Sequence, residues 1–436
     1  MFSFFDSIFN YFYSLSLDKF IRVFWYFVVF ELIRYFFFYP IILSVWGIKL
    51  WLERGKRRMA RSALFSDSPL VSILVPGKNE GDNFYKLAIS LQNQTYKNFE
   101  IIVIDDGSTD NSKKIGKSLE AAGYIHSFYS NDVRGGKASA ANLGLRFAKG
   151  KFIVHLDADC SYDSDALEEI LIPFYLDERI AGVGGNVLVR NHKESLATAL
   201  QTIEYANSIS IGRIITSELG ILRIISGAFG AFRKEAIQRI HGWDIGPGLD
   251  GDISVKLRKL NYKIVFTPFS VCKTTVPNTF EKLLKQRMRW DKSLVRFRLR
   301  KHRDVLIPGP NFNVPNFISF AENIFSNIIL DIHWLVYFIP LLIRFDQTVL
   351  FIITINMILY SLAAVTKFIL FRVFRTRSDI PLFQKLPFVF LMPFYNTFFL
   401  RIVRTIAYSR EWILKASYDD NWNPRKTSQH AKALKI

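Results

Sequence analysis

The stretch FIVHLDADCSYDSDALEEI, residues 152–170, joins a short apolar run to a dense group of acids. Its first five residues, FIVHL, are rich in the β-branched and aromatic types that fill a buried strand. Asp157, Asp159, Asp163 and Asp165 then follow within nine positions. A turn and a helix start need fewer acids than this. We therefore expect part of the group to bind a positive charge.

Two of these acids have the spacing of a metal site. Asp157 and Asp159 are two residues apart at the predicted strand end, where both carboxylates can face one cation. Mg²⁺ or Mn²⁺ takes one or two carboxylates together with phosphate oxygens and water. A lone D-x-D pair is a weak signal, because chance matches are frequent. Asp163 and Asp165 are instead expected to begin the next helix, since Asp165 and Glu168 have the form of a capping box.

The region that contains this stretch alternates between strand and helix patterns from Leu70 onward. Four apolar, β-branched stretches are predicted to form strands: PLVSILVPGKNE, FEIIVIDDGSTD, GKFIVHLDADC and RIAGVGGNVLV. Helical patterns such as NFYKLAISLQNQ and NSKKIGKSLEAAG lie between them. Strands that alternate with helices predict parallel βαβ units, in which ligands bind beyond the carboxyl ends of the strands.

The motif IIVIDDGSTD places two more acids at a predicted strand end. Asp105 and Asp106 end the run, and Gly107 permits a tight turn. Ser108 or Asp110 can cap the helix that follows. A ligand site and a plain strand–turn–helix with capping acids both fit this motif taken alone.

The composition indicates a membrane protein. Half of the 436 residues are hydrophobic, 41 are Phe, and the net charge is +19. Nucleic-acid binders are usually polar outside their basic face, so no nucleic-acid partner is expected. The block 23–52 exceeds the roughly 20 residues that cross a bilayer, and we interpret it as an anchor. Its Glu31 and Arg34 share a helical face and are expected to form an ion pair.

A second apolar region covers residues 313–408. It contains candidate spans at 324–344, 348–371 and 386–408. The last is interrupted by Pro393 and by Arg401, so it can span the membrane or lie at its surface.

Basic flanks predict the orientation. The stretches 53–61 and 282–303 are both strongly basic, and positive loops stay on the cytoplasmic side. Both flank the same central segment, which is therefore predicted to be cytosolic. The unpaired Cys160 and Cys272 agree with a reducing compartment.

These patterns divide the chain into five parts. The basic stretch 278–304 carries ten Lys or Arg against three acids, and its apolar residues recur at roughly helical spacing, as in an amphipathic helix on an anionic leaflet. The expected parts are a membrane anchor (1–62), a cytosolic α/β domain (63–277), this amphipathic interface segment (278–312), transmembrane or interfacial helices (313–408) and a cytosolic tail (409–436).

Seven motifs stand in an order that resembles a known family. They are VSILVPGKNE, IIVIDDGSTD, GGKASAANLGL, HLDADC, ISGAFGAFRK, GLDGDISVKL and QRMRW, and no single one would be specific. The chain resembles a family 2 glycosyltransferase with a GT-A fold over about residues 70–300. With its membrane plan it looks like the membrane synthases of cellulose, hyaluronan, chitin and poly-N-acetylglucosamine.

The resemblance implies a role for each matching residue. Asp105 and Asp106 correspond to acids that hold the uridine end of a nucleotide sugar, while Asp157 and Asp159 match the metal-binding pair. Other implied donor-site residues are Pro76, Glu80 and Lys137, with Gln286, Arg289 and Trp290 of the Q-x-x-R-W motif. Ser226 and Gly227 resemble a loop that lines the acceptor pocket, which Trp290 also borders.

The resemblance also implies a catalytic base. Asp250 aligns with the acid that takes a proton from the acceptor hydroxyl. This chain has Leu249-Asp250 where many relatives have Glu-Asp, so Asp252 is a second candidate. Capping of the following helix is the structural alternative for both acids.

Three functions are weighed. The first is an inverting synthase that uses a UDP-sugar and Mg²⁺ or Mn²⁺, extends a β-linked exopolysaccharide and passes it through its own membrane helices. The second is a single-transfer enzyme similar to ceramide glucosyltransferase that glycosylates a membrane lipid. The third, a transporter or channel with a nucleotide-sensing domain, conflicts with the converging acids. In the first two, the enzyme is integral to the plasma (inner) membrane. No motif identifies an accessory subunit, the sugar or the linkage.

Overall fold

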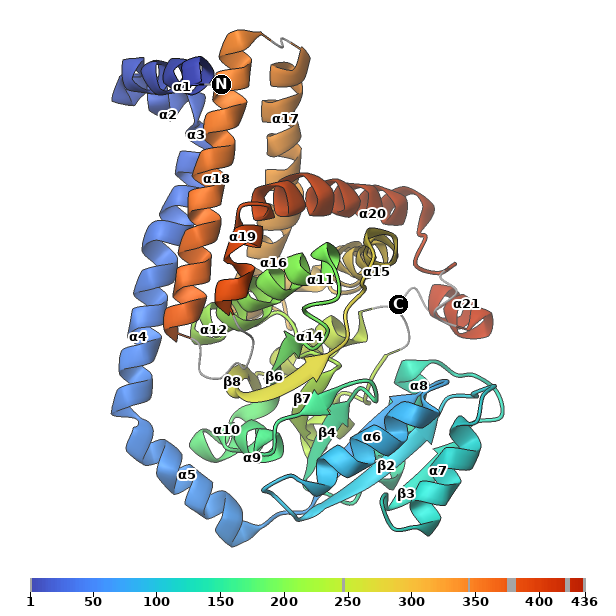
Figure 1. The fold of residues 1–436 in the computed structure, drawn as a ribbon. Coiled ribbons are helices and arrows are strands. Elements are labelled where there is room, and N and C mark those ends of the chain that lie inside the picture. The colour runs from blue at the N-terminus through green and yellow to red at the C-terminus, as the bar shows by residue number, and fades with distance from the viewer. Residues whose placement is uncertain (1, 245–247, 344–345, 375–381, 420–423, 434–436) are drawn as a thin grey trace.

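The protein is described by a computed structural model that covers residues 2–244, 248–343, 346–374, 382–419 and 424–433. Its centre is an eight-stranded sheet with the strand order β3-β2-β1-β4-β7-β6-β8-β5 (Figure 1). The strands are β1 (Val71–Gly77), β2 (Phe99–Asp105), β3 (Ser127–Ser130), β4 (Phe152–Leu156), β5 (Ser161–Tyr162), β6 (Ile180–Val189), β7 (Phe229–Arg233) and β8 (Lys263–Thr274).

The sheet is parallel in one half and mixed in the other. Strands β3, β2, β1 and β4 are parallel, as the alternating pattern predicts. Strand β7 is antiparallel to β4 and to β6, which the pattern did not predict. Phe229 begins β7 opposite Leu156, the last residue of β4, so β7 can only run back along its neighbour. The loop before β7 is therefore held at the carboxyl end of β4.

Helices cover both faces of the sheet. The predicted helical segments form α6 (Gly81–Gln92) and α7 (Ser112–Ala121), and a further helix, α8 (Lys137–Phe147), follows the GGK motif. Side chains such as Ile73, Val103 and Val154 are fully buried beneath them, because parallel strands are covered on both sides. The other helices of this region are α9 (Ala166–Leu171), α10 (Pro173–Leu176), α11 (Leu196–Glu204), η2 (Tyr205–Ile211), α12 (Gly212–Glu218), α13 (Lys234–Arg239) and α14 (Leu249–Lys259).

Three helical stretches among the described residues are long and apolar enough to cross a membrane: Trp25–Leu52, Val314–Ile343 and Gln347–Phe374. They contain α3 (Trp25–Phe27), η1 (Val28–Phe38) and α4 (Tyr39–Leu52), then α16 (Val314–Ile324), η5 (Phe325–Ile329) and α17 (Leu330–Ile343), and finally α18 (Gln347–Phe374). In Figure 1 α4, α17 and α18 rise from the sheet, and α1 (Phe2–Ser14) and α2 (Leu17–Val23) lie at their far end. The chain thus has the helices of a membrane protein.

The candidate span 386–408 is not among these three. It is divided into α19 (Leu386–Val389), η7 (Phe394–Leu400) and α20 (Arg401–Leu414), and Figure 1 shows α20 crossing the direction of α17 and α18. Of the two alternatives for this segment, a helix across the membrane surface fits better than a span. Helix α20 runs six residues beyond the predicted boundary at 408. The buried carboxylate of Glu411 accepts hydrogen bonds from Ser417 there.

Charged residues of the spans find partners on other helices. Arg34 pairs with Glu322 at 3.7 Å and donates to the Tyr39 hydroxyl at 3.2 Å. No ion pair joins it to Glu31 among the described residues, so the predicted pair is wrong. Shared helical spacing allows a contact, but the turn of α16 brings a better-placed carboxylate.

The basic stretch after β8 packs mainly against protein. It forms α15 (Phe280–Ser293), η3 (Leu294–Lys301) and η4 (Arg303–Leu306), and α15 lies beside α20. Leu294 and Val295 are buried against Tyr408, although Phe280 and Leu284 remain exposed. Much of the apolar face expected to contact lipid is thus used to join the domain to α20. The remaining helices are α5 (Arg54–Asp67), η6 (Leu382–Lys385) and α21 (Arg425–Ala433).

Candidate active site

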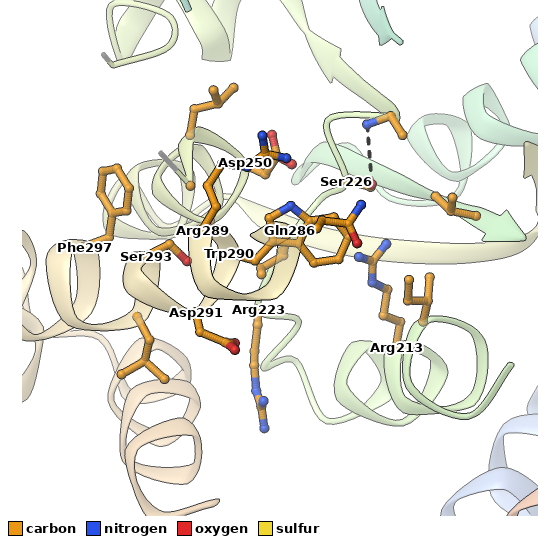
Figure 2. A pocket seen from close by; sticks show the side chains of 18 of the residues that line it. Arg213, Arg223, Ser226, Asp250, Gln286, Arg289, Trp290, Asp291, Ser293 and Phe297 are labelled. Carbon is orange, nitrogen blue, oxygen red and sulfur yellow. Dashed lines mark hydrogen bonds between the residues drawn. The ribbon is translucent and has the colours of Figure 1, made fainter. Parts of the chain in front are cut away.

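A cavity of about 650 Å³ lies where the carboxyl end of β4, the loop before β7, the start of α14 and helix α15 meet. Figure 2 shows Ser226 of the loop before β7, Asp250 of α14 and Trp290 of α15 around it. The sequence-predicted residues that line it are Lys137, Asp157, Asp159, Ser226, Asp250, Gln286, Arg289 and Trp290. Pro76, Glu80, Asp105, Asp106 and Gly227 do not line it. Residues far apart in the sequence thus converge on one site.

The D-x-D pair stands at the end of β4 with a lysine beside it. The Asp157 carboxylate accepts a hydrogen bond of 2.5 Å from Lys137 Nζ, at the start of α8. Burial raises the pKa of Asp159, and the neighbouring charge of Asp157 raises it further. A carboxyl group whose pKa is raised by a neighbouring carboxylate lies in an environment that a cation would stabilise.

The two later acids of the stretch make different contacts from those predicted. Asp165 is the N-cap residue of α9, but its side chain makes no capping hydrogen bond. Glu168 accepts a hydrogen bond of 2.9 Å from Thr95 and pairs with Arg61 at 2.5 Å. The capping-box prediction is therefore wrong, because tertiary contacts take the glutamate. Asp163 lies 3.5 Å from the Lys273 ammonium.

Asp105 is buried and orders its own turn. Its carboxylate accepts hydrogen bonds from the Ser108 backbone N–H at 3.2 Å and from the Ser130 hydroxyl at 2.9 Å. Of the two capping candidates, Asp110 accepts from the Ser112 N–H at the start of α7. Contact between Asp105 and a nucleotide stays a prediction.

Asp106 shapes the loop that carries the lysine. Its two carboxylate oxygens accept hydrogen bonds from the N–H groups of Gly135 and Gly136, at 2.7 and 2.8 Å. Gly136 has a φ of +93°, which glycine adopts without strain. Lys137 follows at once, so Asp106 helps to aim it at Asp157.

Pro76 and Glu80 lie at and just beyond the end of β1. Pro76 is buried opposite Ile104 of β2. Burial raises the pKa of Glu80, a hydrogen bond from Asn83 opposes this, and the charge of Asp159 adds to the rise. Glu80 therefore interacts electrostatically with the D-x-D pair, although it does not line the cavity.

The candidate base is held against the acceptor loop. Asp250 begins α14, and its Oδ2 accepts a hydrogen bond of 2.8 Å from the Gly227 N–H. Burial raises the pKa of Asp250, while Lys137 and the Gly227 N–H lower it. A methyl group at Gly227 would stand 2.4 Å from Asp250 Oδ1, so any side chain at this position would displace the carboxylate.

His155 was not predicted as a functional residue, yet it positions this loop. Its Nδ1 lies 2.7 Å from the Gly227 carbonyl oxygen, which can only accept, so Nδ1 carries the proton. Burial, with the charge of Lys137, lowers the pKa of His155 to about 4. The ring is thus neutral at pH 7. A polar residue inside an apolar strand was the only sequence signal for it.

Asp252, the alternative base, does not line the cavity. It is 1% exposed, and its Oδ1 lies 2.7 Å from His302 Nε2 and 2.8 Å from Lys301 Nζ. Burial raises its pKa, but the His302 hydrogen bond and Lys301 outweigh this and hold the pKa at about 2. Asp252 therefore joins α14 to η3, and this location favours Asp250 as the base.

The Q-x-x-R-W residues share one face of α15. Gln286, Arg289 and Trp290 all line the cavity, because residues three and four apart meet on a helix surface. The Arg287 guanidinium lies 4.7 Å from the centre of the Trp290 ring and pairs with Glu204 at 2.9 Å. Arg287 thus packs against the Trp290 ring and helps to hold it in place.

Two arginines of the cavity wall have no sequence motif. Arg213 of α12 and Arg223 line the membrane side of the cavity. Arg223 pairs with Glu322 of α16. Burial lowers the pKa of Arg213 to about 10, and Arg213 has no ion pair among the described residues. Isolated arginines carry no signal in a chain with 57 Lys and Arg.

A mixed sheet with a D-x-D pair at its centre, a facing carboxylate and a Q-x-x-R-W helix defines a GT-A glycosyltransferase domain. Residues 72–240, within the central α/β domain, match the family model of glycosyl transferase family 2. The resemblance seen in the motifs is therefore confirmed.

Two curated relatives are poly-β-1,6-N-acetyl-D-glucosamine synthases. The one from Staphylococcus epidermidis strain RP62A is 32% identical over 266 residues, which are 59% of this chain and 64% of the relative. The one from Staphylococcus aureus strain MSSA476 is 32% identical over 270 residues, which are 60% and 65%. The chain thus spans just under two thirds of these relatives.

A solved structure has the same fold. It is the mannosyltransferase PcManGT from Pyrobaculum calidifontis in complex with GDP-Man and Mn²⁺, with a TM-score of 0.55 and 17% identity. The match covers 86% of this chain and 99% of that one. It supports the GT-A architecture.

Proposed function

We propose that the protein is an inverting, metal-dependent membrane glycosyltransferase that polymerises a β-linked polysaccharide from a UDP-sugar. One observation carries the proposal: a single cavity collects a D-x-D pair, a facing carboxylate and the Q-x-x-R-W side chains. The names of the staphylococcal relatives favour UDP-N-acetylglucosamine as the donor. The basic flanks favour a plasma-membrane protein with a cytosolic catalytic domain.

The donor set suits a divalent ion. Among the described residues, no group of three or more His, Cys, Asp or Glu could hold a metal alone. Asp157 and Asp159 supply two carboxylates, which is what Mg²⁺ or Mn²⁺ uses when a diphosphate and water complete the shell. Bound there, the ion would neutralise the charge that develops on the departing diphosphate. That PcManGT was solved with Mn²⁺ agrees with this assignment.

The chain's own side chains have complementary roles in transfer. Asp250 takes the proton of the acceptor hydroxyl as the hydroxyl oxygen attacks the anomeric carbon. Attack opposite the leaving group inverts that carbon and converts an α-linked donor into a β-linkage. Arg289 offers a planar donor fork to the diphosphate, and the face of Trp290 suits a sugar ring.

Polymer export is supported by where the cavity leads. Beyond Trp290 its wall is built by Asn323 of α16 and Asn327 of η5, which belong to a candidate span. Polar amides at that position can hydrogen-bond the hydroxyls of a saccharide that leaves the site. We therefore propose that the growing chain passes between the membrane helices.

A donor screen with the purified full-length protein tests the proposal. Radiolabelled UDP-sugars are supplied with Mg²⁺ or Mn²⁺, or with EDTA, and the product is sized by gel filtration. We expect metal-dependent, high-mass polymer and none from the Asp250→Asn variant. A product that forms only with added lipid and carries a single sugar would instead establish the lipid transferase. No incorporation from any UDP-sugar would refute both.

A further inference from the structure

A second cavity, of about 440 Å³, lies on the membrane side of the active site. The two cavities share a wall that includes Ile209, Arg213, Arg223, Ile224 and Asn327. The far wall comes from candidate spans, at positions such as Tyr35 of η1 and Tyr360 of α18. The cavity therefore extends between candidate membrane helices.

Cations outnumber acids around this second cavity. Six basic side chains line it, against two acids, Glu31 and Glu204; the basic residues are Arg34, Arg213, Arg223, Lys367, Arg401 and Arg404. Glu204 is already paired with Arg287.

The carboxylates behind the wall do not balance the excess. Glu322 is shared by Arg34 and Arg223. Asp331 is shared by Arg401 and Arg404, at 2.9 and 2.7 Å. Each of these acids carries one negative charge and is shared by two arginines. One positive charge therefore remains uncompensated in each group.

Two of the lining cations are not in salt-bridge contact with a carboxylate in the part of the chain that the structure describes. Among the described residues, Arg213 and Lys367 form no ion pair, and Lys367 lies over the Tyr35 ring at 4.2 Å. Arg213 Nη1 and Arg401 Nη1 are buried and have no hydrogen-bond partner within the described ranges. Uncompensated cations are costly at membrane depth, so this arrangement calls for an anion.

We propose that this second cavity binds the phosphate of a lipid headgroup. Arginine forks match phosphate oxygens in pairs, and a lysine adds a point charge. Tyr35 of η1 and Ala363 and Ala364 of α18 place the cavity between candidate membrane spans, which favours a lipid over free phosphate. The lipid headgroup would then lie one wall away from the acceptor side of the catalytic cavity. The proposal concerns binding and stands apart from the transfer reaction.

The test uses the full-length protein in dodecyl maltoside, a detergent without phosphate. Melting is followed by tryptophan fluorescence, without any nucleotide sugar, during titration with dioctanoyl phosphatidic acid. Dioctanoylglycerol tests the acyl chains alone, inorganic phosphate tests a soluble source, and a glucuronate tetrasaccharide tests an acidic glycan. We expect a saturable rise in melting temperature with phosphatidic acid, because a ligand that binds only the folded state stabilises it.

Three variants locate the site. Lys367→Gln and Arg213→Gln should each weaken binding of phosphatidic acid about tenfold or more, since each removes a charge-assisted hydrogen bond. Both should still fold, because each loses a surplus cation. Lys49→Gln is the matched control: this lysine is also in a span, but it lies outside the cavity and pairs with Glu218. It should bind like the unchanged protein.

Each outcome decides the proposal. A shift of equal size and variant sensitivity with inorganic phosphate would keep the phosphate site and assign it to a soluble source. Equal shifts with dioctanoylglycerol, tighter binding of the tetrasaccharide, or full binding by both cavity variants would overturn it. Because no donor is present, failure here leaves the proposed transfer reaction untouched, and failure of the donor screen leaves this site untouched.

Discussion

Replacing Asp250 by Asn is the sharpest test of the active site. The change removes the basic carboxylate but keeps the shape and an amide oxygen. That oxygen can still accept the Gly227 N–H, which now lies 2.8 Å from Oδ2. A neutral acceptor forms a weaker bond than a carboxylate, so we expect a stability loss of about 1 kcal/mol or less. The variant should therefore fold and present an intact cavity.

The catalytic loss should be far larger than the loss of stability. A positioned general base contributes about 10²–10⁴-fold to the rate. Removal of Asp250 should thus lower kcat by about that factor, or ~2.7–5.5 kcal/mol of transition-state stabilisation. Affinity for UDP should change little, since the Asp250 carboxylate is bound to the acceptor loop at Gly227 and is not one of the D-x-D pair.

The pH profile adds a second readout. As a general base, Asp250 would work only when deprotonated, and burial raises its pKa above the usual value for aspartate. The kcat/KM of the unchanged protein should therefore be flat at high pH and should fall as the pH drops through this raised pKa. The residual activity of the Asn variant should lack that acidic limb.

The measurements are initial rates with labelled UDP-sugar and calorimetric titration with UDP. A variant that retains more than about a tenth of the rate would refute the assignment of Asp250, given the size expected for a base. A variant that loses UDP binding in parallel with activity would show a structural role instead.

Three further predictions concern the same site. Gly227→Ala should lower kcat, because its methyl group would displace the Asp250 carboxylate. Gly251→Ala is the control and should not lower kcat, because the atom nearest to its added methyl group is 3.8 Å away. Equal rates for the two variants would contradict this prediction. Asp159→Asn should weaken the apparent affinity for Mn²⁺ by tenfold or more, about 1.4 kcal/mol, with little change in melting temperature, and unchanged metal dependence would argue against it as a ligand. Asp252→Asn should destabilise the protein at pH 7, as followed by thermal unfolding, while the unchanged protein should lose this contribution as the pH falls from about 4 through the folded pKa of about 2; a variant as stable as its parent would refute the role.

Several site residues could be predicted because local order places them together. Asp157 and Asp159 follow a five-residue strand that is apolar except for His155, so they had to emerge at its carboxyl end. Gln286, Arg289 and Trp290 are spaced three and four apart, so a helix puts them on one face. Such relations involve only a few consecutive residues, which is why they can be read from the chain alone.

Other features depended on contacts that no local pattern specifies. The Glu168 side chain was expected to cap its own helix, but it contacts Thr95 and Arg61, which lie in a loop and on another helix. Arg34 found Glu322, nearly three hundred positions away, instead of its own neighbour Glu31. Long side chains can reach several partners, and only packing decides which is near.

The sequence by itself indicated the class of domain through the order of seven motifs, and it supplied a candidate metal pair, two candidate bases and the membrane helices. The strands, helices and spans could be predicted because their periodicities are local properties of the backbone and its side chains. The tertiary structure alone decided that β7 turns back along β4, that Asp250 faces Gly227 while Asp252 faces His302, and that surplus arginines surround a second cavity. These depend on which distant segments share space, and burial then sets what each charge must do.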